Sequence, residues 1–380
     1  MASDYANVDY VTFPKPHFPD LRTPATVSRF LRIAAPRSVA VIDQQSAPLE
    51  PGQVRLRTIY SGISAGTELT AYRGTNPYLT SVWDPSSRLF EPGHEALGYP
   101  LDGWGYSEVG EVVEIAPPAG QAAGEAGPDP AVQLGDIVWG IWGHRDEGVL
   151  AAESLRGHVL PQGMDPLAGA FVRVGAIALS AVLAADLGPG STVAIFGQGV
   201  IGLLATRFAV LNGASVISVD GIDARRDKAL EWGAGHALSP APQLAGDIRR
   251  ITAGAGVDVA IELSGNYRAL HEATRAVGAD GTVIAAGFYQ GEAAGVRFGE
   301  EFHHNRVQLL ASQIGSVPNR LRSRWTVPRL QHTVVDHLAT GLVDAPSLVT
   351  HTFPLADSAK AYELLDTDAS SALQVVLEFS

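Results

Sequence analysis

A glycine-rich turn in the middle of the chain has the residue types and the spacing that hold a pyrophosphate. It follows an apolar run, 192–196, and opens a second apolar segment, 200–211; its residues are Gly197, Gln198, Gly199, Val200, Ile201 and Gly202. Between a strand and a helix, the first glycine permits a tight turn, the second lets the backbone approach phosphate, and the third lets the helix pack on the strand. The pyrophosphate then lies at the positive end of the helix. The segment therefore predicts a dinucleotide site.

An acidic residue at the end of the next apolar run indicates which dinucleotide binds. Asp220 follows the run 215–219 and lies 220 − 202 = 18 residues beyond Gly202. A carboxylate there accepts hydrogen bonds from the ribose hydroxyls and repels a 2′-phosphate. Arg225 and Arg226 keep NADP open, because a guanidinium near the ribose serves a phosphate. We predict NAD as the cofactor, with NADP as the less favoured alternative and Arg225 beside the ribose.

The elements around this turn alternate between strand and helix. After a helical segment, 167–187, the predicted strands are 192–196, 215–219, 257–263 and 281–286, with helices at 200–211 and 224–232. Such alternation predicts an α/β, doubly wound parallel sheet. The region 29–113 instead shows short two-residue alternations bounded by proline or glycine, which predict β-structure. Its strands are expected at 39–42, 53–60 and 109–115, with further strands at 136–142 and 373–379.

The composition excludes several classes of protein. The 380-residue chain has a net charge of −13 and no basic stripe, so nucleic acid is not an expected partner. It has no cysteine, which excludes disulfides and thiolate metal sites. It also has no apolar run of about 18 residues, so no membrane span is expected. The segment 1–24 is polar and proline-rich and lacks the features of a secretory signal, so we expect a cytoplasmic protein.

Several short motifs, in this order, resemble the medium-chain dehydrogenase/reductase superfamily over nearly the whole chain. They lie at 61–69, 72–74, 110–113, 135–136, 189–193 and 197–202. The resemblance implies a Rossmann domain, 173–313, and a β-rich GroES-like catalytic domain, 1–172 and 314–380. It also implies hydride transfer with a small-molecule substrate and a homodimer or homotetramer. The segments 287–291, 300–306 and 312–315 further resemble actinobacterial dehydrogenases related to bacteriochlorophyllide and sugar or cyclitol dehydrogenases.

The positions that hold the catalytic zinc in many members of that superfamily carry other residues here. The first falls on Ser64 or Ala65, and the third near Val172 or Arg173. A literal Gly-His-Glu occurs at 93–95, but the strand that follows this motif in the family comes after Tyr106 and Ser107. We therefore align Tyr106 with the family's histidine and place His94 in an inserted loop. The four-cysteine structural zinc lobe is also missing. None of these positions provides a good zinc ligand, so we predict no metal.

Four residues are candidates for the acid–base chemistry. By the resemblance, Thr67 lies at the proton-relay position and Glu68 is its acidic neighbour. Tyr106 has a phenol that either faces the substrate oxygen or fills the vacated zinc cavity. To act as a base it would need its pKa lowered from about 10. His144 follows the strand 136–142, where it either reaches the cleft or is solvated.

Residues of the second half are expected to pass the nicotinamide ring. By the resemblance these are Ser264, Gly287, Phe288 and Tyr289. Other residues have open roles: His303 and His304 contact substrate or lie at the surface, and Trp83, Trp104 and Trp142 line the pocket or belong to the core.

The favoured function is NAD-dependent, zinc-independent interconversion of a secondary alcohol and a ketone, on a polyol, sugar-like or cyclic substrate. One alternative is reduction of an activated C=C bond, as in zinc-free quinone or enoyl reductases. Those enzymes commonly prefer NADPH, so Asp220 counts against this alternative. A third is a non-catalytic nucleotide-binding protein. The sequence does not identify the substrate or the direction of the reaction.

Overall fold

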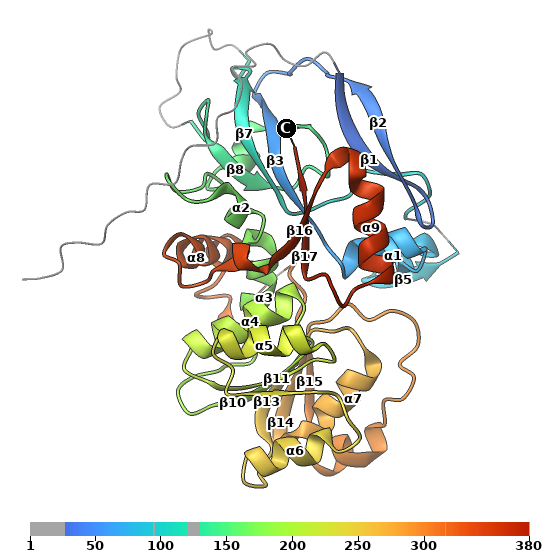
Figure 1. Ribbon diagram of the computed structural model, residues 1–380, viewed down its shortest axis with the longest axis vertical. Helices are drawn as coiled ribbons and strands as arrows, with labels where there is room; N and C mark the ends of the chain where they lie inside the picture. Colours follow the sequence, from blue (N-terminus) through green and yellow to red (C-terminus); the bar gives the residue numbers. More distant parts are fainter. Residues whose placement is uncertain (1–26, 94–95, 120–129, 316, 380) are drawn as a thin grey trace, which may run out of the picture.

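The computed structural model describes residues 27–93, 96–119, 130–315 and 317–379. His94, Glu95 and the N-terminal segment therefore lie outside the described residues. Figure 1 shows a β-rich part that contains the first and last strands, and a second part built on a sheet flanked by helices. This arrangement confirms the predicted fold class.

The second part is a six-stranded parallel sheet in the order β12-β11-β10-β13-β14-β15. Its strands are β10 (Thr192–Phe196), β11 (Ser215–Val219), β12 (His236–Leu238), β13 (Val257–Glu262), β14 (Val277–Ala285) and β15 (Gln308–Ala311). Its helices are α3 (Val172–Ala184), α4 (Val200–Leu211), α5 (Asp223–Glu231), α6 (Leu244–Ile251) and α7 (Tyr267–Ala276). The strand order reverses between β10 and β13, and ligands of such sheets bind outside the carboxyl ends of the strands at this point.

The β-rich part contains a sheet of order β16-β17-β3-β7-β8, with β9 also paired to β3. Its strands are β3 (Gln53–Ile63), β7 (Glu108–Ile115), β8 (Ile137–Gly140), β9 (Glu147–Ala151), β16 (Val349–Pro354) and β17 (Gln374–Glu378). A second sheet has the order β2-β1-β6, from β1 (Val27–Ala35), β2 (Ser38–Gln45) and β6 (Leu101–Asp102). Helices α1 (Thr67–Arg73) and α9 (Ser358–Thr367) pack with these strands, and a hairpin of β4 (Ser81–Asp84) and β5 (Leu89–Pro92) lies beside them.

The junction between the two parts differs from the expected elements. The helical segment expected over 167–187 is two helices, α2 (Pro166–Gly169) and α3, separated at 170–171. Helix α8 (Val327–Ala339) packs against α3, and Val334 lies in the same core as Phe171 and Phe208. The chain returns to the sheet of β3 only at β16 and β17. The domain limits given above remain a prediction.

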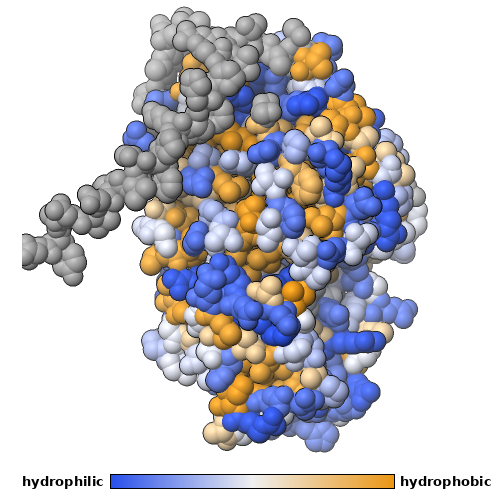
Figure 2. Space-filling model, viewed as in Figure 1, coloured by the Kyte–Doolittle hydropathy of each residue, from blue (hydrophilic) through white to orange (hydrophobic). Residues whose placement is uncertain are grey.

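None of the helices in the described ranges is long and apolar enough to cross a bilayer. Figure 2 shows hydrophilic and hydrophobic residues interspersed over the visible face of both parts.

Candidate active site

The glycine-rich turn has the backbone geometry that its sequence predicts. Gly197 follows β10 with φ of +86°, and a Cβ there would meet the Ser264 backbone nitrogen at 2.8 Å. A Cβ at Gly202 would come within 1.8 Å of the Gly197 carbonyl oxygen. At Gly199, the N-cap of α4, a Cβ would meet nothing within 4 Å. Gly197 and Gly202 therefore close the turn, and Gly199 leaves space outside it. The turn fits a dinucleotide pyrophosphate.

Gln198 acts within the protein instead of facing a ligand. Its side chain is fully buried; its Nε2 donates to the Ile195 carbonyl at 2.9 Å, and its Oε1 accepts from the Thr206 hydroxyl at 2.9 Å. Its backbone nitrogen donates to the Asp220 carboxylate at 2.7 Å. This network fixes the turn on β10 and α4. The Gln198 side chain, which we predicted at the cofactor, is thus a support for the turn.

Asp220 lies at the end of β11 beside the turn. Its second carboxylate oxygen accepts from the Ile222 backbone nitrogen at 2.8 Å, and the residue is 9% exposed. Both oxygens are therefore oriented by backbone donors before any ligand binds. A fixed carboxylate at this strand end suits a ribose with two free hydroxyls.

The two arginines of α5 are held by other partners. The Arg225 guanidinium donates to the carbonyls of Ala369 and Ala372, at 2.7 and 2.9 Å. Arg226 donates to the Asp220 carbonyl at 2.7 Å and to the Asp223 carboxylate. The Arg225 side chain thus ties α5 to the segment before β17 through one nitrogen, while its Nε has no hydrogen-bond partner within the described residues. The placement of Arg225 at the ribose stays a prediction.

A buried glutamate, which the sequence analysis did not single out, organises the predicted nicotinamide side. Glu262, the last residue of β13, is 0% exposed and accepts hydrogen bonds from both the backbone nitrogen and the hydroxyl of Ser264. It also accepts from the Gly265 nitrogen at 3.1 Å and from the Tyr289 hydroxyl. Burial raises the pKa of Glu262, against the lowering effect of these donors. An ionisable residue in an apolar strand was the signal that could have identified it.

The segment after β14 lies close to this glutamate. A Cβ at Gly287 would come within 2.4 Å of the Gly265 nitrogen, so only glycine allows the two loops to meet. Burial and the neighbouring Glu262 carboxylate raise the pKa of Tyr289. Phe288 is 41% exposed. Ser264 and Tyr289 therefore brace the loop through Glu262, while Phe288 is the side chain that remains available to a ligand.

The three aligned metal-ligand positions meet in space. The Tyr106 hydroxyl donates to the Ser64 hydroxyl at 2.5 Å, and the Arg173 guanidinium carbon lies 5.2 Å from the centre of the Tyr106 ring. The Thr67 backbone nitrogen donates to the same Ser64 oxygen at 3.3 Å. We name this group, Ser64, Thr67, Tyr106 and Arg173, the hydroxyl centre. It offers no thiolate, imidazole or carboxylate, the ligands that zinc takes in proteins, so its donor set does not fit a zinc ion.

The environment of Tyr106 keeps its phenol protonated. Burial raises its pKa, and this outweighs the lowering effects of the Ser64 and Thr67 hydroxyls and of Arg173. A base would need the opposite shift. The raised pKa therefore favours a protonated phenol, which donates to the Ser64 hydroxyl.

His144 lies beneath the hydroxyl centre in a fully buried network. Its Nε2 is 2.7 Å from the Glu68 carboxylate and its Nδ1 is 2.6 Å from the Ser61 hydroxyl, which donates to Glu108 at 3.0 Å. With the Ser61 hydroxyl donating to Glu108, the Nδ1–H of His144 donates to Ser61. Burial lowers the pKa of His144, but the two glutamates outweigh it and the pKa is raised. This direction favours the imidazolium, and at 1% exposure His144 is buried and not solvated.

Glu68 connects this network to the hydroxyl centre. Its Oε1 accepts from the Ser64 backbone nitrogen at 2.9 Å, and its Oε2 accepts from the Tyr362 hydroxyl at 2.7 Å as well as from His144. Glu68 is 0% exposed. The residue fixes Ser64 from behind and acts as a positioning residue, which corrects the expectation of a direct catalytic contact.

The remaining aromatic and histidine candidates lie apart from the hydroxyl centre or within the core. Trp142 is buried and donates to the Thr58 hydroxyl at 2.9 Å, and Trp104 packs against the core of β1 and α9. Trp83 packs on Phe90 in the β4–β5 hairpin. His303 and His304 are exposed.

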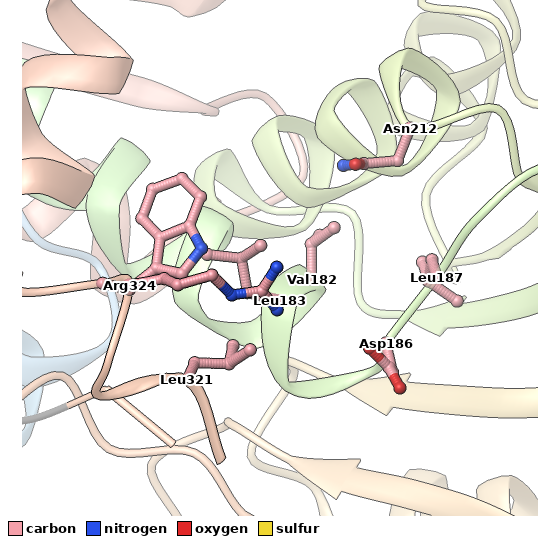
Figure 3. A pocket seen from close by; sticks show the side chains of 8 residues that line it. Val182, Leu183, Asp186, Leu187, Asn212, Leu321 and Arg324 are labelled. Atoms are coloured by element: carbon pink, nitrogen blue, oxygen red, sulfur yellow. The ribbon is translucent and has the colours of Figure 1, made fainter. Parts of the chain in front are cut away.

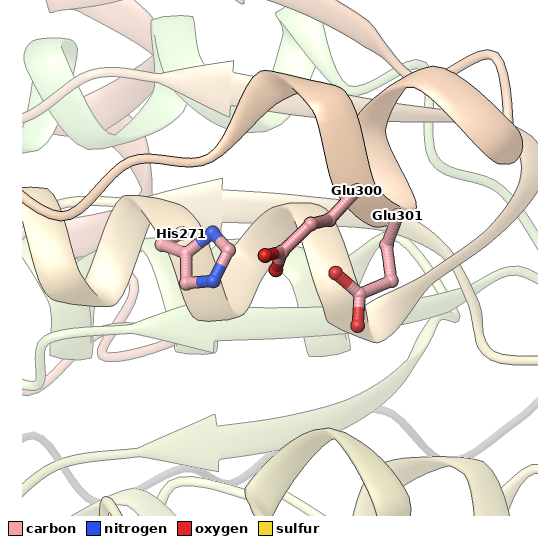
Figure 4. A group of neighbouring side chains, drawn as sticks. All are labelled: His271, Glu300 and Glu301. Atoms are coloured by element: carbon pink, nitrogen blue, oxygen red, sulfur yellow. The ribbon is translucent and has the colours of Figure 1, made fainter.

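A trio of potential metal ligands within the described ranges lies elsewhere. His271 on α7 faces Glu300 and Glu301 of the turn 298–302, with ligand atoms within 4.8 Å of one another (Figure 4). Arg275 already pairs with Glu301 at 3.1 Å. The charge of this group is thus partly balanced without an ion.

Two cavities flank α3. One, of about 190 Å³, lies at its carboxyl end between Asp186, Asn212 and Leu321 (Figure 3). The other, of about 320 Å³, lies at its amino end between Arg173, Gln313 and Gln331. Only the second is continuous with a residue of the hydroxyl centre.

Comparison with known proteins supports this reading of the fold. Residues 200–327 match the family described as zinc-binding dehydrogenase. The structure of 2R,3R-butanediol dehydrogenase from Bacillus subtilis superimposes with a TM-score of 0.73 and 22% identity, covering 93% of this chain and 100% of that one. The chain therefore shares the two-part fold of that dehydrogenase, and its segment 200–327 is similar to the zinc-binding dehydrogenase family.

Similar proteins include sugar dehydrogenases. D-guloside 3-dehydrogenase of Escherichia coli strain K12 is 28% identical over 357 residues, which cover 91% of this chain and 98% of that protein. L-galactonate-5-dehydrogenase of the same strain is 27% identical over 328 residues, covering 84% and 90%. Over most of its length the chain is thus similar to proteins named as dehydrogenases of a guloside and of a galactonate.

Proposed function

We propose that the protein is an NAD-dependent, zinc-independent dehydrogenase that interconverts a secondary alcohol and a ketone on a polyol or sugar-like substrate. The hydrogen bond from Tyr106 to Ser64 carries the proposal, because it puts a proton-transferring pair where a metal would otherwise bind. The similarity to D-guloside 3-dehydrogenase and L-galactonate-5-dehydrogenase favours a polyhydroxylated substrate.

The chain's own residues orient the substrate and move one proton. The glycine-rich turn 197–202 and Asp220 would hold the nicotinamide dinucleotide, which would supply the hydride-transfer chemistry. The hydroxyl proton of the alcohol passes to the Ser64–Tyr106 pair and on towards solvent, and in reduction the pair delivers a proton to the carbonyl oxygen. Glu68 and the His144 imidazolium beneath it hold Ser64 in place.

A substrate screen without metal tests this proposal. We expect oxidation of polyols or sugars, followed by absorbance of the reduced nicotinamide under anaerobic conditions, to proceed unchanged with a chelator present. Elemental analysis should find no stoichiometric zinc. Reduction of enones without alcohol oxidation would support the C=C alternative instead, and about one zinc per chain would contradict the proposal.

Asp220 should set the cofactor preference. We expect the wild type to bind NADH more tightly than NADPH, and Asp220→Ser to narrow that difference by about tenfold or more. The reason is that a charge-assisted hydrogen bond contributes about 1.5–3 kcal/mol. Fluorescence titration measures both affinities, and Asp227→Ser, an exposed aspartate on α5, is the matched control. A wild type that prefers NADPH would show that Asp220 does not select the cofactor.

A further inference from the structure

Arg173 is a half-buried guanidinium without the partner that such a group normally has. Within the described ranges its Nε atom is inaccessible to solvent and has no hydrogen-bond partner, and no carboxylate pairs with it. Arg55 and Arg73 pair with carboxylates, whereas Arg173, like Arg145, has no carboxylate partner within the described ranges. Because Arg173 also lines a cavity beside the hydroxyl centre, a ligand in that cavity is the candidate partner of its guanidinium.

The cavity beside Arg173 has the size and lining of a small-molecule site. Its volume of about 320 Å³ falls in the range of ligand pockets, roughly 300–1,000 Å³. Arg173 is the single charged residue among its lining residues; Gln313 and Gln331 add amides, and the others are apolar or glycine. One positive charge with two neutral hydrogen-bonding groups suits an anionic, hydroxylated ligand.

The cavity also lies where the second substrate of a dinucleotide enzyme has to be. Gln313 follows β15, and Gly197 follows β10 of the same parallel sheet. The carboxyl ends of parallel strands share one edge, so both segments lie at the edge where the dinucleotide is expected. The Arg173 guanidinium that lines the cavity also lies over the Tyr106 ring, with its carbon 5.2 Å from the ring centre.

We propose that Arg173 binds the carboxylate of the substrate, and that the substrate is a polyhydroxylated acid with its reacting hydroxyl close to that carboxylate. This inference rests on the proposed function and narrows its substrate class. A planar guanidinium binds a carboxylate through two parallel hydrogen bonds. Because the same guanidinium lies against the Tyr106 ring, a carboxylate held by it places a neighbouring carbinol at the Tyr106–Ser64 pair.

Binding measurements on the full-length protein test the proposal without depending on turnover. Calorimetry compares hexonates such as gluconate and galactonate with the matching neutral alditols, glucitol and galactitol, with NADH present. We expect the wild type to bind at least one acid about tenfold more tightly than its alditol. Arg173→Gln should remove that difference, and Arg173→Lys, which keeps the charge but not the paired donors, should restore it in part.

The control removes a similar guanidinium outside the cavity. Arg329 on α8 stacks on Trp325 at 4.6 Å and is exposed; Arg329→Gln should bind the acids as the wild type does. Thermal unfolding of each variant verifies that it is folded.

Three binding results overturn the inference. It fails if no acid binds, if Arg173→Gln binds acids as well as the wild type, or if acids and alditols lose affinity equally. Oxidation of neutral alcohols with no preference for acids would overturn it while leaving the proposed function intact. Acid binding that depends on Arg173, without oxidation of any alcohol, would instead overturn the proposed function alone.

Discussion

Replacing His144 with leucine is expected to lower the free energy of unfolding by about 3–5 kcal/mol, because it leaves two buried carboxylates without their cation. Glu68 and Glu108 are each 0% exposed, and the His144 ring links them through a direct contact and through Ser61. Leucine has a volume similar to that of histidine, so the decrease in the free energy of unfolding reflects lost charge and hydrogen bonds more than lost packing. Urea unfolding at neutral pH measures it.

The exposed His303 gives a matched control, since His303→Leu should change the same free energy by no more than about 0.5 kcal/mol. If His144→Leu unfolded at the wild-type urea concentration, the imidazolium would not balance the two glutamates, and our protonation state for His144 would be wrong.

The charge of His144 can be checked by measuring, as a function of pH, the difference in the free energy of unfolding between wild type and His144→Leu. The pKa of His144 is raised above its ordinary value of 6.5. A raised pKa means that the folded state holds the proton more tightly than the unfolded state. The stabilisation by His144 is therefore fully present below about pH 6.5 and is lost as pH rises through the folded pKa. Glu68, Glu108 and Tyr362 face this ring. Burial also raises the pKa of Glu108, so the contribution of Glu108 to stability is likewise lost as pH rises.

Local signals in the sequence were sufficient for the dinucleotide turn. The bounds predicted for β10, β11 and α4 agree with the structure, because a short apolar strand, three spaced glycines and an apolar helix all lie within 20 contiguous residues. Which atoms of that turn face a ligand was not predictable. Gln198 lies inside the motif, yet its side chain is held by Ile195 and Thr206.

The network under the hydroxyl centre could not be read from the sequence, because its members are far apart along the chain. Ser61 and His144 are separated by 83 residues, and Glu68 and Tyr362 by 294. Neither pair has a local motif, and a polar histidine in a glycine-rich segment reads as solvated. The contacts of Arg225 with the carbonyls of Ala369 and Ala372 were not predictable for the same reason.

The predicted alignment of the metal-ligand positions, by contrast, named three separated segments that lie together in the structure. Ser64, Tyr106 and Arg173 meet, as they must if Tyr106 occupies the position of the family's histidine. The strand after Tyr106 supplied that register, since β7 begins at Glu108 and pairs with β3, the strand that ends at Ile63 next to Ser64. Register between paired strands therefore brings the first two positions together.

Tyr106→Phe should lower turnover by about 10²–10⁴-fold, the usual contribution of a general acid–base group, while leaving NADH affinity nearly unchanged. The phenylalanine ring keeps the contact with Arg173 and removes only the hydroxyl that donates to Ser64. Since burial raises the pKa of the phenol, Tyr106 stays neutral across ordinary assay conditions, and the pH profile of kcat should show no ionisation that Tyr106→Phe abolishes.

The companion variant Ser64→Ala separates the two hydroxyls of the pair. If the proton moves through both in sequence, the two variants should lower kcat by similar factors, and the double variant should be little worse than either one, because groups that act as a unit are not additive. Steady-state kinetics with the preferred alcohol, together with a calorimetric NADH titration of each variant, measures the split between turnover and binding. Wild-type turnover in Tyr106→Phe would show that the tyrosine only fills space at the aligned ligand position, and the proton would then have to leave through Ser64 and Thr67 alone.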